Sequence, residues 1–262
     1  MIPAGHLDPV AGLIDAASSW LWTQVTGLAD HWASQMVFRP LGWPTAVSGL
    51  YAVSRDAAWS LIGLVASLAA IRSMAPSLAL PGAGIPIALL LERLVAAALM
   101  GLAGLWTVQT ALALNNAIVH AILGSAALWR PKAGPAGVLS PLIVLLLGAA
   151  MLTLMLYLVL FYAIRAIEIF VLSAAIPWFA LWWATRQDDA PVSTLTRELG
   201  AAIFVQSFQA GAFWLVARLG ASSSWGSMGG FLEVAMMWYM TRIPGQLRRL
   251  IGAPAVSGRL WR

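Results

Sequence analysis

The tract "LIVLLLGAAMLTLMLYLVLFYAIRAIEIFVLSAAIPWFALWW", from Leu142 to Trp183, decides the fold of this chain. Its only charged residues are Arg165 and Glu168. As a single helix the tract would be roughly 60 Å long at ~1.5 Å per residue, about twice the ~30 Å thickness of a hydrocarbon core. We therefore expect two membrane spans that meet near Arg165 and Glu168.

The composition of the whole chain supports a membrane environment. Of its 262 residues, 61% are hydrophobic and 10% are charged, with a mean hydropathy of +0.83. Soluble domains carry about 25% charged residues, so lipid or protein must cover much of this surface. The composition predicts an all-α integral membrane protein, a polytopic helical bundle with about six transmembrane helices plus amphipathic interfacial helices. We expect residues 1–262 to form a single membrane domain.

The N-terminal residues 8–38 predict an amphipathic helix. Asp8 is a suitable cap and Pro9 suits the first helical position. Apolar residues recur with a period of 3.6 residues opposite two aspartates and several hydroxyl residues. We expect this helix to lie along the membrane surface or against a partner rather than to span the bilayer. No basic residue precedes Arg39, so the segment is not typical of a cleaved signal peptide.

The remaining apolar segments lie within residues 46–241, which we interpret as the transmembrane bundle. Besides the two spans expected in the long tract, the candidate spans are Ala57–Ile71, Ile85–Trp106, Leu199–Gly220 and a short one over 231–244. Residues 107–124 predict a second amphipathic helix, and residues 185–198 a polar loop. Five arginines in the basic tail 242–262 predict a cytoplasmic C-terminus of a multi-pass protein in the cell (inner) membrane.

Arg165 and Glu168 are three residues apart and can meet on one helix face. They are either a polar lining or inter-subunit contact, or a charge pair at headgroup level where two spans join and Arg can snorkel. We interpret them as marking the break in the long tract.

Four further polar residues lie inside apolar segments. Glu92 and Arg93 are adjacent, so they point about 100° apart, and we expect them to face a bundle interior or a water-filled cavity rather than the interface. Gln206 and Gln209 are three residues apart, and we expect them to tie helices together by hydrogen bonds rather than to line a pathway.

Catalytic and metal-binding patterns are missing from the sequence. It contains no HExxH, GxSxG or phosphate-binding loop, and no cysteine. The three histidines have no metal-ligand spacing. We therefore expect no enzymatic activity, no cofactor and no bound metal.

The order of several short motifs resembles a known family. Arg165 leads into a small-residue segment that ends at Pro177, Val205, Gln206, Gln209 and Ala210 form a V-Q-x-x-Q-A pattern, and an Ile243–Pro244 pair closes the last span. Over about residues 85–250 the chain resembles the TrbL-like family, the polytopic inner-membrane subunits of type IV secretion and conjugation systems. The long polar C-terminal extension of many relatives is absent from this sequence.

The resemblance implies a structural channel or platform subunit that helps to move DNA or protein across the membrane. It also implies a homo-oligomer in the lipid bilayer, other secretion-machine subunits including separate ATPases, and transient contact with the translocated DNA or protein. Two other interpretations stay open. One is a small-solute permease or its membrane subunit, in which Glu92, Arg93 and the glutamines form a substrate site. The other is a membrane scaffold whose amphipathic helices recruit partners.

Overall fold

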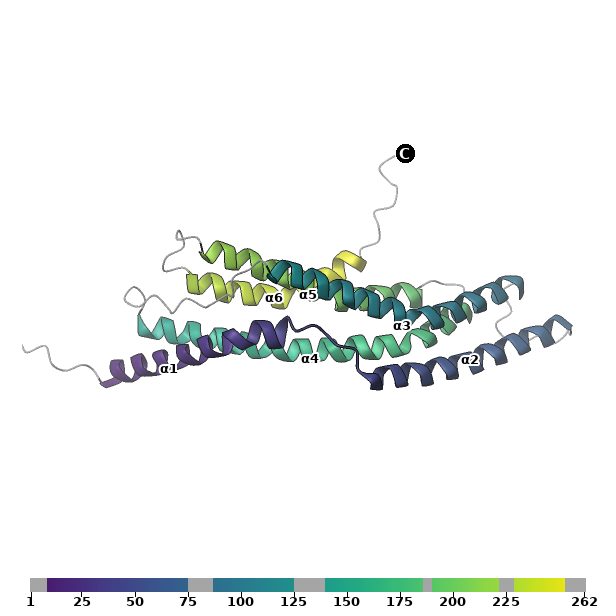
Figure 1. Cartoon of the computed structure of the whole chain (residues 1–262), viewed down its shortest axis with the longest axis horizontal. Helices are drawn as coiled ribbons and strands as arrows, with labels where there is room; N and C mark the ends of the chain where they lie inside the picture. Colours follow the sequence, from purple (N-terminus) through teal and green to yellow (C-terminus); the bar gives the residue numbers. More distant parts are fainter. Residues whose placement is uncertain (1–8, 75–86, 125–139, 186–189, 222–228, 253–262) are drawn as a thin grey trace, which may run out of the picture. The chain divides into compact units, whose positions relative to one another are not determined.

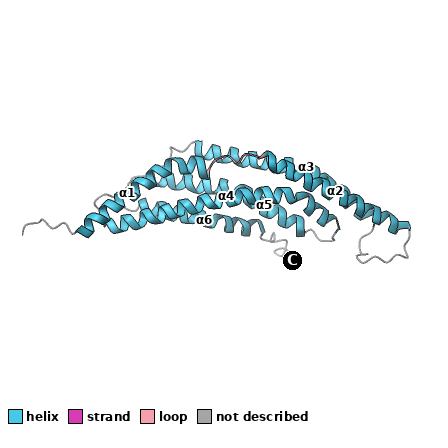
Figure 2. Cartoon of the chain, turned by 90° about the horizontal axis from the view of Figure 1, so that it is seen from below, coloured by secondary structure: helices cyan, strands magenta, loops and turns pink. Residues whose placement is uncertain are grey.

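A computed structural model describes residues 9–74, 87–124, 140–185, 190–221 and 229–252. Apart from residues 38–44 and 140, these residues are helical, and they contain no strand (Figures 1 and 2). The elements in chain order are α1 (Pro9–His31), the π-helix η1 (Trp32–Val37), α2 (Thr45–Met74), α3 (Ile87–Gly124), α4 (Pro141–Thr185), α5 (Ala190–Ala221) and α6 (Gly229–Gly252). The predicted all-α fold is confirmed. Residues 186–189 of the expected polar loop and residues 253–262 of the expected tail lie outside the described residues.

Three of the described helices are long and apolar enough to cross a membrane. They are α3 over Ala88–Gly124, α4 over Pro141–Thr185 and α5 over Val192–Leu219. These helices are consistent with a membrane protein, whereas the predicted count of about six spans is not confirmed.

The predicted break in the long apolar tract is absent, because α4 runs without interruption from Pro141 to Thr185. Ser140 starts the helix by accepting the N–H of Ile143 at 2.9 Å, and Pro141 suits the first helical position. No glycine or proline occurs between Ala149 and Ile176 to end the helix near Arg165. Its 45 residues give a length of about 67 Å at 1.5 Å per residue. α4 is therefore a single helix, although it is longer than the bilayer core is thick.

Other predicted boundaries also shift toward longer helices. Residues 107–124, expected as a separate amphipathic helix, continue α3 without a break. The predicted polar loop over 185–198 is wrong beyond its first residues, since α5 begins at Ala190. Pro191, the second residue of α5, fits this start because the first turn of a helix needs no N–H donor from it. α6 extends to Gly252, past the predicted end of the bundle at residue 241.

The described chain divides into two compact units. Unit 1 contains residues 9–40, 115–124, 140–164, 204–221 and 229–247, and unit 2 contains residues 41–74, 87–114, 165–185, 190–203 and 248–252. Four helices, α3 to α6, contribute residues to both. Each unit is described on its own below.

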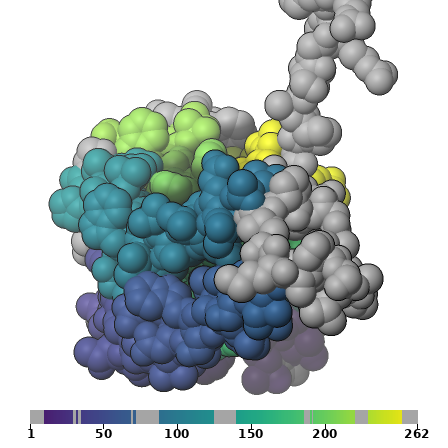
Figure 3. All heavy atoms as spheres, turned by 90° about the vertical axis from the view of Figure 1, so that its right-hand side faces the viewer, coloured from purple at the N-terminus to yellow at the C-terminus, as the bar shows by residue number. Residues whose placement is uncertain are grey.

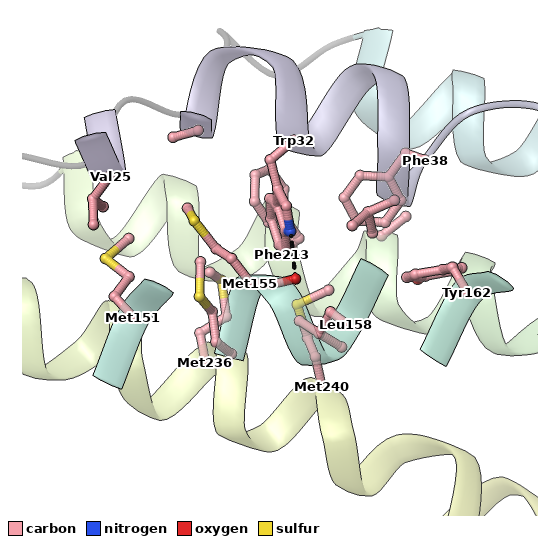
Figure 4. Close-up of a cluster of buried hydrophobic side chains, with 14 of the residues drawn as sticks. Val25, Trp32, Phe38, Met151, Met155, Leu158, Tyr162, Phe213, Met236 and Met240 are labelled. Carbon is pink, nitrogen blue, oxygen red and sulfur yellow. Dashed lines mark hydrogen bonds between the residues drawn. The ribbon is translucent and has the colours of Figure 1, made fainter. Parts of the chain in front are cut away.

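In unit 1 the core forms where α1 and η1 pack against α4, α5 and α6. Trp32 is fully buried, and its indole N–H donates to the Met155 carbonyl oxygen at 3.0 Å (Figure 4). Five buried methionines surround this region, and their unbranched side chains fill irregular gaps well; they are Met151, Met155, Met236, Met237 and Met240. Phe38 completes the cluster by an edge-to-face contact with Phe213, with ring centroids 5.4 Å apart.

The N-terminal helix is present as predicted, but its buried face differs from the expected one. The buried stripe of α1 and η1 consists of Ser18, Trp22, Val25, Ala29 and Trp32. The apolar residues Val10 and Leu13, near the start of α1, are 58% and 71% exposed. α1 packs closely on α4, since a Cβ at Gly148 would lie only 3.1 Å from Leu21. The helix thus packs on the chain's own bundle.

In unit 2 the helices α2, α3 and α4 approach closely at glycines. The Tyr51 hydroxyl donates to the Gly101 carbonyl oxygen at 2.7 Å, and a Cβ at Gly104 would lie 2.7 Å from Ile176. The outer surfaces of α2 and α3 form part of the face in Figure 3. Exposed large apolar side chains on them include Leu64, Leu68, Leu91, Val95 and Leu99. A surface of this kind suits lipid or protein better than water.

Candidate functional site

The buried polar residues of unit 1 form hydrogen-bonded ties between helices. Gln206 on α5 accepts from the Asn115 amide of α3 at 3.1 Å and donates to the Val37 and Arg39 carbonyl oxygens at 2.9 and 3.3 Å. Ser207 donates to the Asn115 side-chain oxygen at 2.7 Å. Val37 ends η1, where carbonyls lack intrahelical donors. Gln206 therefore caps the N-terminal segment and holds it against α5.

Gln209, one turn along α5, ties two other helices. The Tyr162 hydroxyl of α4 donates to its side-chain oxygen, and its amide donates to the Met240 carbonyl oxygen of α6 at 2.8 Å. Gln209 is fully buried. Each of its two polar ends therefore has a partner on a different neighbouring helix.

The partner of Gln209 on α6 is set by a proline. Pro244 lies inside α6 and has no N–H, so the carbonyl of Met240, four residues earlier, loses its intrahelical donor. Neighbouring helices re-satisfy such freed groups where water is absent. Gln209 does so here, which connects the V-Q-x-x-Q-A pattern to the Ile243–Pro244 pair by a hydrogen bond.

In unit 2, Arg165 lies buried in the packing stripe of α4 rather than at a helix end. Its guanidinium donates to the Ala202 carbonyl oxygen and, at 2.7 Å, to the Ile203 carbonyl oxygen, both on α5. Burying a charge is costly unless it is hydrogen-bonded. These acceptors explain how α4 continues through a charged residue.

Glu168 contacts a residue other than Arg165. Arg248 of α6 binds Glu168 on α4 and, through Nε at 3.0 Å, Glu198 on α5. Arg197 is 3.1 Å from the second Glu198 oxygen. These partly exposed side chains form an ion-pair cluster that joins three helices. Charge pairs in such clusters fix register and orientation more than they add stability.

Glu92 and Arg93 take different environments on α3. Glu92 is exposed on this chain, whereas Arg93 is half-buried, with its guanidinium 5.2 Å from the centre of the Trp183 ring on α4. Because the two residues are adjacent on a helix, their side chains point in different directions, as expected. Both residues belong to unit 2, whereas Gln206 and Gln209 belong to unit 1.

Sequence reasoning identified the two glutamines and the charges on α4, but it missed Tyr162, Glu198 and Arg248 as their partners. In the sequence, only Pro244 indicated that the Met240 carbonyl would lack its intrahelical donor. Within the described residues, no group of three or more His, Cys, Asp or Glu residues could hold a metal ion. The arrangement of these side chains connects neighbouring helices.

Comparisons with protein-family models, with curated proteins and with solved structures found no match to this chain.

Proposed function

We propose that this chain is a structural channel or platform subunit of a type IV secretion-like, conjugative machine that translocates DNA or protein. It resides in the cell (inner) membrane as a multi-pass protein with a cytoplasmic C-terminus, crosses the bilayer with α3, α4 and α5 at least, and forms homo-oligomers. Separate ATPases supply the energy, and the chain touches the translocated DNA or protein transiently. It is not an enzyme and uses no cofactor.

The observation that carries this proposal is the length of α4 together with its exposed apolar side chains. Large apolar residues are exposed in both of its halves, and they are Leu142, Leu146, Leu156, Leu160, Ile167, Val171, Trp178 and Trp182. A bilayer with a core of ~30 Å covers only about 20 residues of an upright helix, and tilting adds a few more. The rest of this surface requires a protein cover. Subunits of an assembled machine supply such a cover, and a monomeric permease does not.

The sites described above support a structural role. The amides of Gln206 and Gln209 bond to groups of neighbouring elements, so a solute would have to break these bonds in order to bind there. This argues against the permease interpretation. The link between Gln209 and the carbonyl freed by Pro244 also unites two motifs on which the resemblance to the TrbL-like family rests.

The test is deletion of the coding sequence in its own host, followed by complementation. We expect conjugative DNA transfer or protein secretion to be lost and then restored by the wild-type gene, with growth and solute uptake unchanged. Normal transfer in the deletion strain, or loss of uptake of one solute class, would contradict the proposal. Neighbouring genes for secretion ATPases would strengthen it, and a gene for a nucleotide-binding transporter subunit would favour the permease.

A further inference from the structure

α6 has two unlike faces within unit 1. One face is buried in the bundle and consists of Glu233, Met236, Met237, Met240, Ile243 and Leu247. The other face exposes Trp238 by 54% and Tyr239 by 49%, and Arg242 is exposed one turn after Trp238. α6 is not among the three helices apolar enough to cross a membrane. An interfacial helix typically combines aromatic and basic residues in this way.

Two of these exposed side chains contact each other. The Arg242 guanidinium lies 5.1 Å from the centre of the Trp238 ring. No ion pair to Arg242 occurs among the described residues. The hydrocarbon core is an unfavourable environment for Arg242, because an arginine at the bilayer centre costs about 2.5–3.5 kcal/mol on insertion scales. Water is unfavourable for two adjacent, half-exposed aromatic rings.

We propose that Trp238, Tyr239 and Arg242 form a headgroup-level site that binds anionic phospholipids. Trp and Tyr are enriched at the membrane–water interface, and a guanidinium pairs with phosphate oxygens through two parallel hydrogen bonds. The charge of Arg242 complements the negative surface of the cytoplasmic leaflet. This site rests on the proposed membrane location and assigns α6 a role different from the predicted sixth span. It holds α6 at the membrane surface while the buried face stays in the bundle.

The first test measures phosphatidylglycerol binding by the purified full-length chain with native mass spectrometry. Arg242→Gln should weaken binding roughly fivefold, because one arginine near an anionic surface contributes about 1 kcal/mol and 1.4 kcal/mol is tenfold. Arg39→Gln is the matched control, since Arg39 is another exposed arginine of unit 1, and binding should stay unchanged. Equal loss in both variants, or no loss in either, would overturn the proposal.

The second test places α6 in the membrane directly. The chain has no cysteine, so Tyr239→Cys accepts a single nitroxide label in vesicles of equal parts phosphatidylcholine and phosphatidylglycerol. We expect accessibility typical of the headgroup level. A label deep in hydrocarbon, fully in water, or broadened by the label of a second copy would refute the site. Carbonate extraction of the same vesicles separates the two proposals. A chain retained in the membrane without a headgroup signal refutes only this site, and a chain that is extracted refutes the membrane location as well.

Discussion

Replacing Gln209 tests whether one side chain compensates for the proline of α6. Gln209→Met keeps the length of the side chain but removes both polar ends. It leaves the Met240 carbonyl and the Tyr162 hydroxyl without the partners seen in the structure. A buried polar group left without a partner costs about 1–3 kcal/mol in general. Hydrogen bonds between membrane helices average about 0.6 kcal/mol with a maximum near 1.7 kcal/mol. We therefore expect a loss of about 1–2 kcal/mol in the free energy of unfolding.

The second step of this experiment adds Pro244→Ala. Alanine restores an N–H at residue 244, and this group satisfies the Met240 carbonyl from within α6. Gln209→Met should then cost less, because only the bond between the Tyr162 hydroxyl and Gln209 is lost. The expected coupling between the two substitutions is about 0.5–1 kcal/mol, within the usual range for residues that share a hydrogen bond.

Equilibrium unfolding in mixed detergent micelles measures all four variants of this cycle. Gln206→Met is the matched control, because the bonds of Gln206 involve Asn115, Val37 and Arg39 and do not depend on the proline. Its cost should be the same whether or not the chain also carries Pro244→Ala. If Gln209→Met costs equally in both backgrounds, Gln209 does not compensate for the missing N–H and the reasoning is refuted.

Three further predictions concern packing, the ion pairs and topology. Gly104→Ala should lower the melting temperature in detergent, because its Cβ would lie 2.7 Å from an isoleucine of α4; Gly63→Ala, with open space around it, should leave it unchanged or raise it, since alanine favours helices by up to about 1 kcal/mol. Arg248→Leu should increase proteolysis of the C-terminal end of α6, whereas Arg249→Leu should not; equal sensitivity would mean that the contacts of Arg248 with two carboxylates do not hold the helix. A reporter fused after Arg262 should be active in the cytoplasm, because basic flanks resist translocation, and activity only outside would reverse the proposed orientation.

Helix content was the most predictable feature of this chain, because long apolar segments of this kind favour membrane helices. The same pattern predicted several helix boundaries wrongly. The tract containing Arg165 was divided because of its length, yet carbonyl acceptors on α5 allow α4 to continue. Such acceptors come from a different part of the chain, so no local pattern around residue 165 contains them.

The candidate residues were found more easily than their partners. Gln206 and Gln209 stand out because polar side chains in apolar helices need hydrogen bonds. Their partners, Asn115 and Met240, depend on which helices are neighbours. Glu168 was paired with Arg165 by spacing alone, but the structure pairs it with Arg248. A spacing of three residues allows a contact, and the tertiary arrangement decides whether it forms.

We propose that this chain supports translocation as an assembled membrane subunit, and that Glu92, an exposed charge on α3, acts in assembly rather than in insertion. Glu92 lies on the outer surface of α3, so a neighbouring subunit can reach it without changing the fold. The test of this role measures DNA transfer by cells that carry Glu92→Leu. The amount of the chain in their membrane fraction is measured in parallel. Leucine removes a charge that is unfavourable within a membrane span, so we predict unchanged or higher membrane content with impaired transfer. Normal transfer at normal membrane content would contradict the claim.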